Sequence, residues 1–288
     1  PKGNERTTEN LRNEFIRICS EIRKKGGLPQ VNHPFDVSFS TRYNSEFWDM
    51  VKIFESIEIW NGATPFAAGT INAKAFKKWL SLLEDGKRLT ATTGSDTHNI
   101  YGDDYFGMTE WLDWLMDIVM KHPEIYPVQM NEKVAYLTWL YKKVWPRLLS
   151  WVEQSNTPST IHNYVYTNGK NQPQEILQAI REGHSFISNG PLITAEINGV
   201  SYGDTATLKD NTGKLSVHVF SKKPINHLWM YTGVDKKVEI CTESGSLEGG
   251  FAYDIVTDEF DFGGASWALF VADGGENNLA ISNPILFA

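Results

Sequence analysis

The sequence predicts an α/β fold of parallel βα units, followed by an antiparallel β-sandwich. Two observations favour this class. Up to about residue 190, amphipathic helical stretches alternate with short apolar runs, the pattern of buried parallel strands joined by helices. Beyond Pro191, short runs of alternating polarity follow one another with Gly, Asn and Asp between them, which is typical of a sandwich. The predicted domains are residues 1–190 and 191–288.

The elements of the first domain follow from apolar periodicity and from turn residues. Residues 8–25 predict an amphipathic helix that Gly26 and Gly27 end. Further helices are expected at 45–54, 70–86 and 172–183, and short strands at 28–35, 56–62, 88–94 and 160–167. This alternation breaks at residues 108–157, where sequence rich in Trp, Leu and Met predicts a helical insertion of about 50 residues.

The composition fits a globular protein and excludes several classes. The chain has 288 residues, of which 41% are hydrophobic and 12% aromatic, enough for a large core. A formal net charge of −8 argues against a nucleic-acid partner. No apolar run reaches the length of a membrane span, so we expect a soluble protein of bacterial type, either cytoplasmic or secreted or periplasmic. Two cysteines exclude a disulfide scaffold and a cysteine-rich zinc site.

Polar residues stand at the ends of three expected strands, where the chemistry of α/β folds is found. In chain order they are Asn32, His33, Glu58, Asn61, Asp96, His98 and Asn99. Asp96 and His98 are two residues apart, so on an extended chain their side chains point to the same side. With His33 they form a ligand set that zinc, manganese or iron accepts. On spacing alone, a hydrogen-bonded polar rim without metal explains the same residues equally well.

Four segments in one order make the sequence resemble a known family. They are GGLPQVNHPF, IEIWNG, GSDTHN and EILQAIREGHSFISNGPLI. Together they resemble the PHP (polymerase and histidinol phosphatase) superfamily, and within it the CehA/McbA-like metallohydrolases. The resemblance covers most of the chain outside the predicted helical insertion. It implies that residues 1–190 are the C-terminal part of a distorted β/α barrel with a centre of two or three divalent metal ions at its mouth.

The resemblance also implies an activity and roles for individual residues. The activity is hydrolysis of a small-molecule phosphoester or related bond by metal-activated water. Carried over by position, His33, Asp96 and His98 are the implied metal ligands. The residues implied to orient ligands or to bind substrate are Asn32, Glu58, Asn61 and Asn99. At position 184 the resemblance leads us to expect Arg, and His184 would replace it as a substrate contact when protonated.

One departure from the family concerns the first half of the barrel. The family begins with a His-x-His metal motif, whereas no two of the seven His residues here are two apart. We therefore expect an N-terminal segment or another chain to complete the barrel, and this chain alone to be inactive.

The alternative is a non-catalytic binding or surface protein, whose β-sandwich recognises a glycan or a protein on a relict barrel. The presence of His33, Asp96 and His98 favours the hydrolase, because a site without function does not need them.

Overall fold

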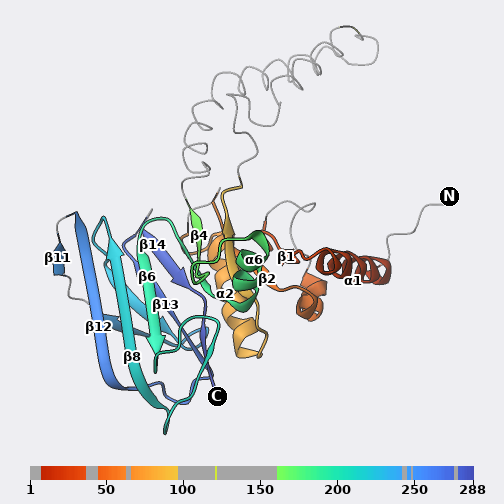
Figure 1. Cartoon of the computed structure of the whole chain (residues 1–288). Coiled ribbons are helices and arrows are strands. Elements are labelled where there is room, and N and C mark those ends of the chain that lie inside the picture. Colours follow the sequence, from red (N-terminus) through yellow and green to blue (C-terminus); the bar gives the residue numbers. More distant parts are fainter. Residues whose placement is uncertain are drawn as a thin grey trace. The chain divides into compact units, whose positions relative to one another are not determined.

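The computed structural model describes most of the chain outside one long segment (Figure 1). The described residues are 8–36, 45–62, 66–96, 121, 161–241, 245–247, 249–275 and 278–288. The chain divides into two units, residues 1–94 with 161–288, and residues 95–160. Of the second unit only Ser95, Asp96 and Lys121 are described, so the predicted insertion at 108–157 lies outside the described residues apart from Lys121. The fold below is that of the first unit.

The N-terminal part forms the predicted βα units. Its elements are α1 (Thr8–Lys24), β1 (Gln30–Val31), the 3-10 helix η1 (Ser45–Ile53), β2 (Ser56–Asn61), α2 (Ile71–Glu84) and β3 (Thr90–Gly94). The three strands pair in parallel in the order β1-β2-β3. Every residue of β2 is buried, as expected for a central strand of a parallel sheet. The α/β class is therefore confirmed.

Helix α2 packs one apolar face against this sheet. Thr70 caps the helix, since its side chain accepts a hydrogen bond from the N–H of Ala73. Trp79 and Leu80 are among its fully buried side chains, and they share one core with Ile57 and Ile59 of β2. The indole Nε1 of Trp79 donates to the carbonyl of Leu89 at 2.8 Å, which leaves no unpaired polar atom on the buried ring.

A second sheet of eight strands contains segments from both predicted domains. Its main order is β10-β9-β13-β14-β5-β4, and β15 and β7 pair beside β13. The strands are β4 (His162–Val165), β5 (Ser185–Ser188), β7 (Thr205–Ala206), β9 (His227–Tyr231), β10 (Lys237–Cys241), β13 (Trp267–Asp273), β14 (Leu279–Ser282) and β15 (Ile285–Phe287). Helix α6 (Pro173–Glu182) joins β4 to β5. Because β5 pairs with β14, the predicted boundary at residue 191 does not separate the sheets.

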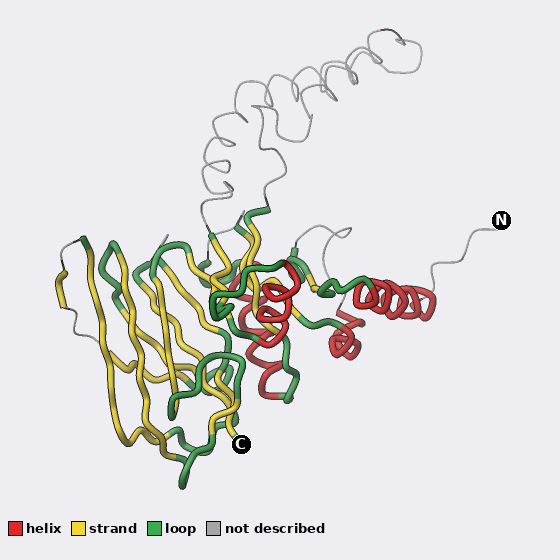
Figure 2. The backbone as a smooth tube through the Cα atoms, viewed as in Figure 1, coloured by secondary structure: helices red, strands yellow, loops and turns green. Residues whose placement is uncertain are grey.

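The third sheet has four strands and alternates strictly between buried and exposed residues in β6. Its order is β11-β12-β8-β6. The strands are β6 (Leu192–Ile197), β8 (Thr212–Ser221), β11 (Gly245–Leu247) and β12 (Gly250–Asp261). The buried residues of β6 share one core with β9 and β13 of the eight-stranded sheet, including Ile193, Leu228 and Phe270. Figure 2 shows these long strands in yellow beside the shorter elements of the N-terminal part.

Two expectations from the sequence concern the fold as a whole: part of a β/α barrel, and no membrane span. The strands in the described ranges form three sheets, and none of these sheets closes into a barrel. Among the described helices, none has the length and apolarity that crossing a membrane requires.

Two asparagine side chains occupy the edge of β3 that faces away from β2. Asn283, which follows β14, accepts from Ala91 N at 2.7 Å and donates to Ala91 O at 3.3 Å. Asn163 of β4 accepts from Thr93 N at 3.0 Å and donates to Thr93 O at 2.8 Å. A carboxamide presents one acceptor and N–H donors, so each side chain replaces a neighbouring strand residue. These four hydrogen bonds join the parallel sheet to the eight-stranded sheet.

Glu55, directly before β2, joins two helices to the sheet. Arg23 of α1 lies 2.5 Å from its Oε1, and Arg181 of α6 lies 2.7 Å from its Oε2. Arg181 also donates to the carbonyl of Gly27 at 3.2 Å. Burial acts to raise the pKa of Glu55, but the hydrogen bonds from Arg181 and Arg23 outweigh it, so the pKa lies below its ordinary value.

We expect Glu55→Gln to lower the free energy of unfolding by about 1.5–3 kcal/mol near neutral pH, because two partly buried guanidinium groups lose their counter-charge. The folded pKa lies below the unfolded value of about 4.3, so this stabilisation is present above that value and is lost as pH falls through the folded pKa. The difference between wild type and variant in urea unfolding should therefore shrink in acid. Arg17→Ala on the same helix, which removes an exposed pair with Glu14, is the control and should leave the midpoint unchanged. An equal difference at every pH would contradict the assignment.

We expect Asn283→Ala to cost about 3 kcal/mol or more, because the fully buried N–H and C=O of Ala91 lose their partners. Asn163→Ala should cost less, since Asn163 is more exposed. Urea unfolding measures both, and hydrogen exchange should be faster at the amides of Ala91 and Thr93 respectively. Asn171→Ala, at an exposed position before α6, is the matched control. Unchanged exchange at Ala91 in the Asn283 variant would rule the interaction out as a stabilising one.

Candidate functional site

His33 follows β1 and carries a buried ring nitrogen without a hydrogen bond. Its backbone is left-handed, with φ of 28°, which is uncommon for a residue other than glycine. The side chain is 25% exposed, but within the described residues its Nδ1 is buried and has no hydrogen-bond partner. Oδ2 of Asp36 lies 3.9 Å from this nitrogen, too far for a hydrogen bond. Buried polar atoms are nearly always paired, so this one calls for an explanation.

Glu58 of β2 holds the backbone of His33 in place. Its side chain is buried, with 7% of the residue exposed. Its Oε2 accepts a hydrogen bond from the N–H of His33 at 2.6 Å. Its Oε1 lies 2.9 Å from the position that a Cβ on Gly94 would occupy, so a side chain at position 94 would collide with the carboxylate. One buried carboxylate therefore binds the segment that follows β1 and lies close to the end of β3.

An irregularity in strand pairing lies beside Glu58. Glu58 pairs with Thr92 and Trp60 pairs with Thr93, so β2 has one extra residue between these two pairs. Such bulges bend a strand and redirect its side chains, and they are frequent next to active sites. Here the bulge lies between Glu58 and Asn61, the two polar residues that the sequence singles out in this strand.

A polar layer beneath Glu58 links all three parallel strands. Oε1 of Gln30 accepts from Ser56 Oγ at 3.0 Å and from Thr92 Oγ1 at 2.8 Å. Nε2 of Gln30 donates to Oδ1 of Asn32 at 2.7 Å. Asn32 is exposed, so this hydrogen bond fixes the orientation of an otherwise free side chain beside His33. Sequence reasoning missed Gln30; its signal was a glutamine within a short apolar strand.

Asn61 ends β2 and is fastened by a helix. Its N–H donates to Oδ1 of Asn72 at 2.9 Å, and its carbonyl accepts from Nδ2 of Asn72 at 3.0 Å. Asn72 lies in the first turn of α2 and is 2% exposed. The N–H of Gly62 donates to the carbonyl of Gly94 at 2.7 Å, which joins the chain after β2 to the end of β3. Asn72 was not predicted; its signal was an amide on the buried face of an amphipathic helix.

The structure brings together part of the predicted site. Asn32 and His33 directly follow β1, and the carboxylate of Glu58, within β2, accepts the N–H of His33. Asp96 has a left-handed backbone, with φ of 57°, and belongs to the second unit. His98 and Asn99 lie outside the described residues. Within the described ranges, no group of three His, Cys, Asp or Glu side chains is arranged to hold a metal ion, so the ligand set of His33, Asp96 and His98 stays a prediction.

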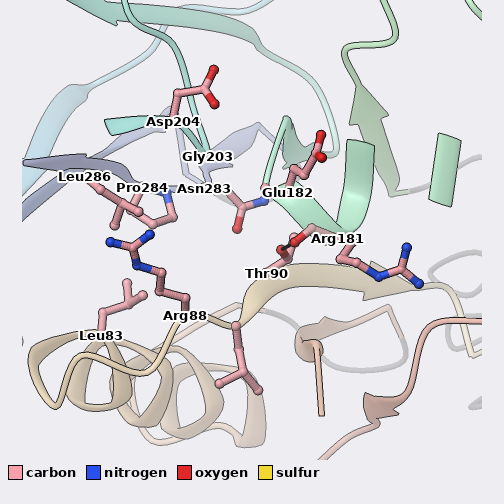
Figure 3. Close-up of a pocket in the computed structure, with 12 residues that line it drawn as sticks. Leu83, Arg88, Thr90, Arg181, Glu182, Gly203, Asp204, Asn283, Pro284 and Leu286 are labelled. Atoms are coloured by element: carbon pink, nitrogen blue, oxygen red, sulfur yellow. Dashed lines mark hydrogen bonds between the residues drawn. The ribbon is translucent and has the colours of Figure 1, made fainter. Parts of the chain in front are cut away.

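His184 lies near a pocket at the start of β3, whereas His33 lies near the end of β3. Its Nε2 is 3.1 Å from Oδ1 of Asp204, and its Nδ1 is 3.5 Å from Oε2 of Glu182. Glu182 and Asp204 line a pocket of about 350 Å³ together with Thr90, the first residue of β3 (Figure 3). The site of His33 lies beside Gly94, the last residue of β3. The structure therefore does not bring His184 together with His33, and carboxylates already contact both nitrogens of its ring.

A separate chain of hydrogen bonds has the residue types of a Ser-His-Asp triad. Oγ of Ser216 lies 3.0 Å from Nε2 of His218, whose Nδ1 lies 2.6 Å from Oδ1 of Asp254. The group lies on the outer face of β8 and β12, and the side chains of His218 and Asp254 are 51% and 69% exposed. The ladders on both sides of β8 engage its backbone N–H groups, so they cannot stabilise an oxyanion. We assign no nucleophile here.

Comparison of the chain with family models, with curated proteins and with solved structures finds no significant match. Its function has to be inferred from the residues and geometry described above.

We expect Gly94→Ala to lower the free energy of unfolding by about 1–3 kcal/mol, because the new Cβ would lie 2.9 Å from Oε1 of Glu58. Hydrogen exchange at the amide of His33 should become faster, since Glu58 is its acceptor. A double-mutant cycle supplies the control: in a Glu58→Ala background the same glycine substitution should cost much less. Additive effects of the two substitutions would show that the contact is unimportant.

Proposed function

We propose that the chain carries part of a metal-dependent hydrolase centre of phosphoesterase type at the carboxyl ends of β1, β2 and β3. The observation that supports this most directly is the buried Nδ1 of His33, which has no hydrogen bond within the described residues. An imidazole nitrogen together with carboxylates is a donor set that zinc, manganese or iron accepts. The ordered motifs that resemble the PHP superfamily favour the same function.

In this proposal His33 acts as a ligand together with Asp96 and His98, which follow β3 directly in the sequence. The complete centre holds two or three divalent ions. A bound divalent metal supplies hydroxide by lowering the pKa of its water toward neutrality.

The chain's own residues position this chemistry. Glu58 holds the N–H of His33 and so keeps the imidazole in place although the backbone is left-handed. Asn32, oriented by Gln30, offers an amide to the substrate or to a ligand. Asn61 takes the same role at the end of β2, where Asn72 immobilises its backbone. Such neighbours of metal ligands fix the orientation of the ligands and tune their basicity.

The fold is part of the proposal. We propose that β1, β2 and β3 belong to the C-terminal part of a PHP-type barrel, and that the eight-stranded and four-stranded sheets with their common core form the appended sandwich. Within the described residues β1 has only β2 as a strand neighbour. Its other edge can therefore accept a strand from a further segment or from another chain.

We expect Zn²⁺ to bind weakly to this chain and to shift the NMR resonances of the His33 ring. His33→Ala should weaken the binding at least about tenfold, because one of three ligands is lost. His218→Ala, which removes an exposed imidazole in the four-stranded sheet, is the matched control and should change nothing. Isothermal titration calorimetry measures the affinities. Equal zinc affinity of the wild type and the His33 variant would sink the proposal.

A protein that includes the complete barrel should hydrolyse bis(p-nitrophenyl) phosphate after loading with zinc, manganese or iron. In that protein His33→Ala or Asp96→Ala should lower kcat by about 100-fold or more. Unchanged turnover in both variants would contradict the assignment of the ligands.

A further inference from the structure

A second pocket, of about 300 Å³, lies between α2 and one face of the eight-stranded sheet. Four aromatic side chains form much of its wall: Phe66, Phe76, Trp229 and Tyr231. Two charged residues line it as well, Lys237 of β10 and Asp273 of β13. The pocket lies within the first unit, and the hydrolase proposal assigns it no role.

Neighbouring aromatic rings of the pocket are steeply inclined to one another, in T-shaped pairs. The rings of Phe66 and Phe76 are 5.6 Å apart and inclined at 70°. Those of Phe76 and Tyr231 are 5.5 Å apart and inclined at 84°. Trp229 follows the same face of β9 two residues before Tyr231, so both rings project from one side of the sheet. In each of these pairs the edge of one ring lies against the face of the other, and all four rings also line the pocket.

An ammonium group already rests on this wall. Nζ of Lys237 lies 3.8 Å from the centre of the Trp229 ring and 5.8 Å from that of Tyr231. Both distances are within the range in which a cation is attracted by the negative face of an aromatic ring. The Lys237 side chain is exposed, so it can move into solvent without leaving a buried charge behind. The position of Lys237 shows that these rings interact favourably with a positive charge.

The remaining charge in the pocket also favours a cation. The carboxylate of Asp273 is held by the N–H of Gly275, which donates to its Oδ1 at 2.9 Å. Burial first and the charge of Asp273 second raise the pKa of Tyr231, so the negative charge is felt at the ring. An anionic ligand would face both this carboxylate and the negative faces of the rings.

We infer that this pocket binds the quaternary ammonium group of a small molecule of the choline type, which displaces the Lys237 ammonium from the rings. A primary ammonium ion keeps its strongly bound water, whereas a trimethylammonium group is weakly hydrated and places methyl groups against aromatic faces. Four rings and one carboxylate in a volume of about 300 Å³ match the chemistry of such a group. This inference does not depend on the proposed hydrolase centre.

The test is calorimetric titration of the whole chain with choline chloride and, separately, with 3,3-dimethyl-1-butanol. The alcohol has the shape of choline with a neutral carbon in place of the nitrogen. We expect choline to bind at least about tenfold more tightly than the alcohol. Equal binding of the two compounds, or no binding of choline, would overturn the inference.

Variants of the charged residues separate the charge effects without touching the core. Lys237→Ala should strengthen choline binding about threefold or more, because the competing ammonium is gone. Lys236→Ala removes the same charge one residue away and should leave the affinity unchanged. Asp273→Asn should weaken binding about threefold or more. Weaker binding in the Lys237 variant would show that the lysine contacts the ligand, and would also overturn the inference.

Trp229→Leu keeps an apolar side chain and removes a ring, so choline binding should fall about tenfold while binding of the neutral alcohol changes little. Equal losses for both compounds would show that the ring acts only through its volume and would overturn the inference. Should this variant not fold, the two compounds and the Lys237 and Asp273 variants still decide the question.

Discussion

The side-chain amides of Asn283 and Asn163 are the interaction on which the rest of the architecture depends. They complete the hydrogen bonding of β3 on the side where no strand pairs with it in the described residues. Without them the buried peptide groups of Ala91 and Thr93 would be unpaired in the interior, at a cost comparable to a large part of the stability of a domain. Because Thr93 directly precedes Gly94, the same contacts hold the end of β3, near which Oε1 of Glu58 lies.

The candidate site combines a rigid frame with local features that oppose stability. Glu58 is buried and hydrogen-bonded to the N–H of His33. Yet His33 has a left-handed backbone and, within the described residues, a ring nitrogen without a hydrogen bond. Such features persist only where the surrounding structure enforces them, and they are concentrated at functional sites. Here the hydrogen bonds that Gln30 accepts from Ser56 and Thr92 hold the three strands together beside Glu58.

Local pattern predicted the N-terminal elements well and long-range pairing poorly. The strand expected at 56–62 forms at Ser56–Asn61, and the helix expected at 70–86 forms at Ile71–Glu84, because apolar periodicity reflects which face is buried. Of the site residues named from the sequence, His33 and Glu58 are in contact, through the hydrogen bond from the His33 N–H to the Glu58 carboxylate. The strand expected at 160–167 forms too, but periodicity does not specify whether its partner is β3 or β5. β5, which lies before residue 191, pairs with β14, about 90 residues later in the chain. The N–H of Leu279 also donates to the side chain of Asn189. The boundary at residue 191 therefore does not coincide with a boundary between sheets. His184 was placed by resemblance to a family, which carries no information on where its ring points here.

The wide separation of Ala91 and Asn283 has a consequence during protein synthesis. The two residues are 192 positions apart, so at about 5–20 residues per second the ribosome releases Ala91 about 10–40 s before its partner. Throughout that interval the N–H and C=O of Ala91 lack their native hydrogen-bond partner. An unpaired strand edge can pair with strands of other chains. Closing so long a loop is also entropically unfavourable and slow. The nascent parallel strands therefore keep an open edge at β3 until the segment around Asn283 has been synthesised.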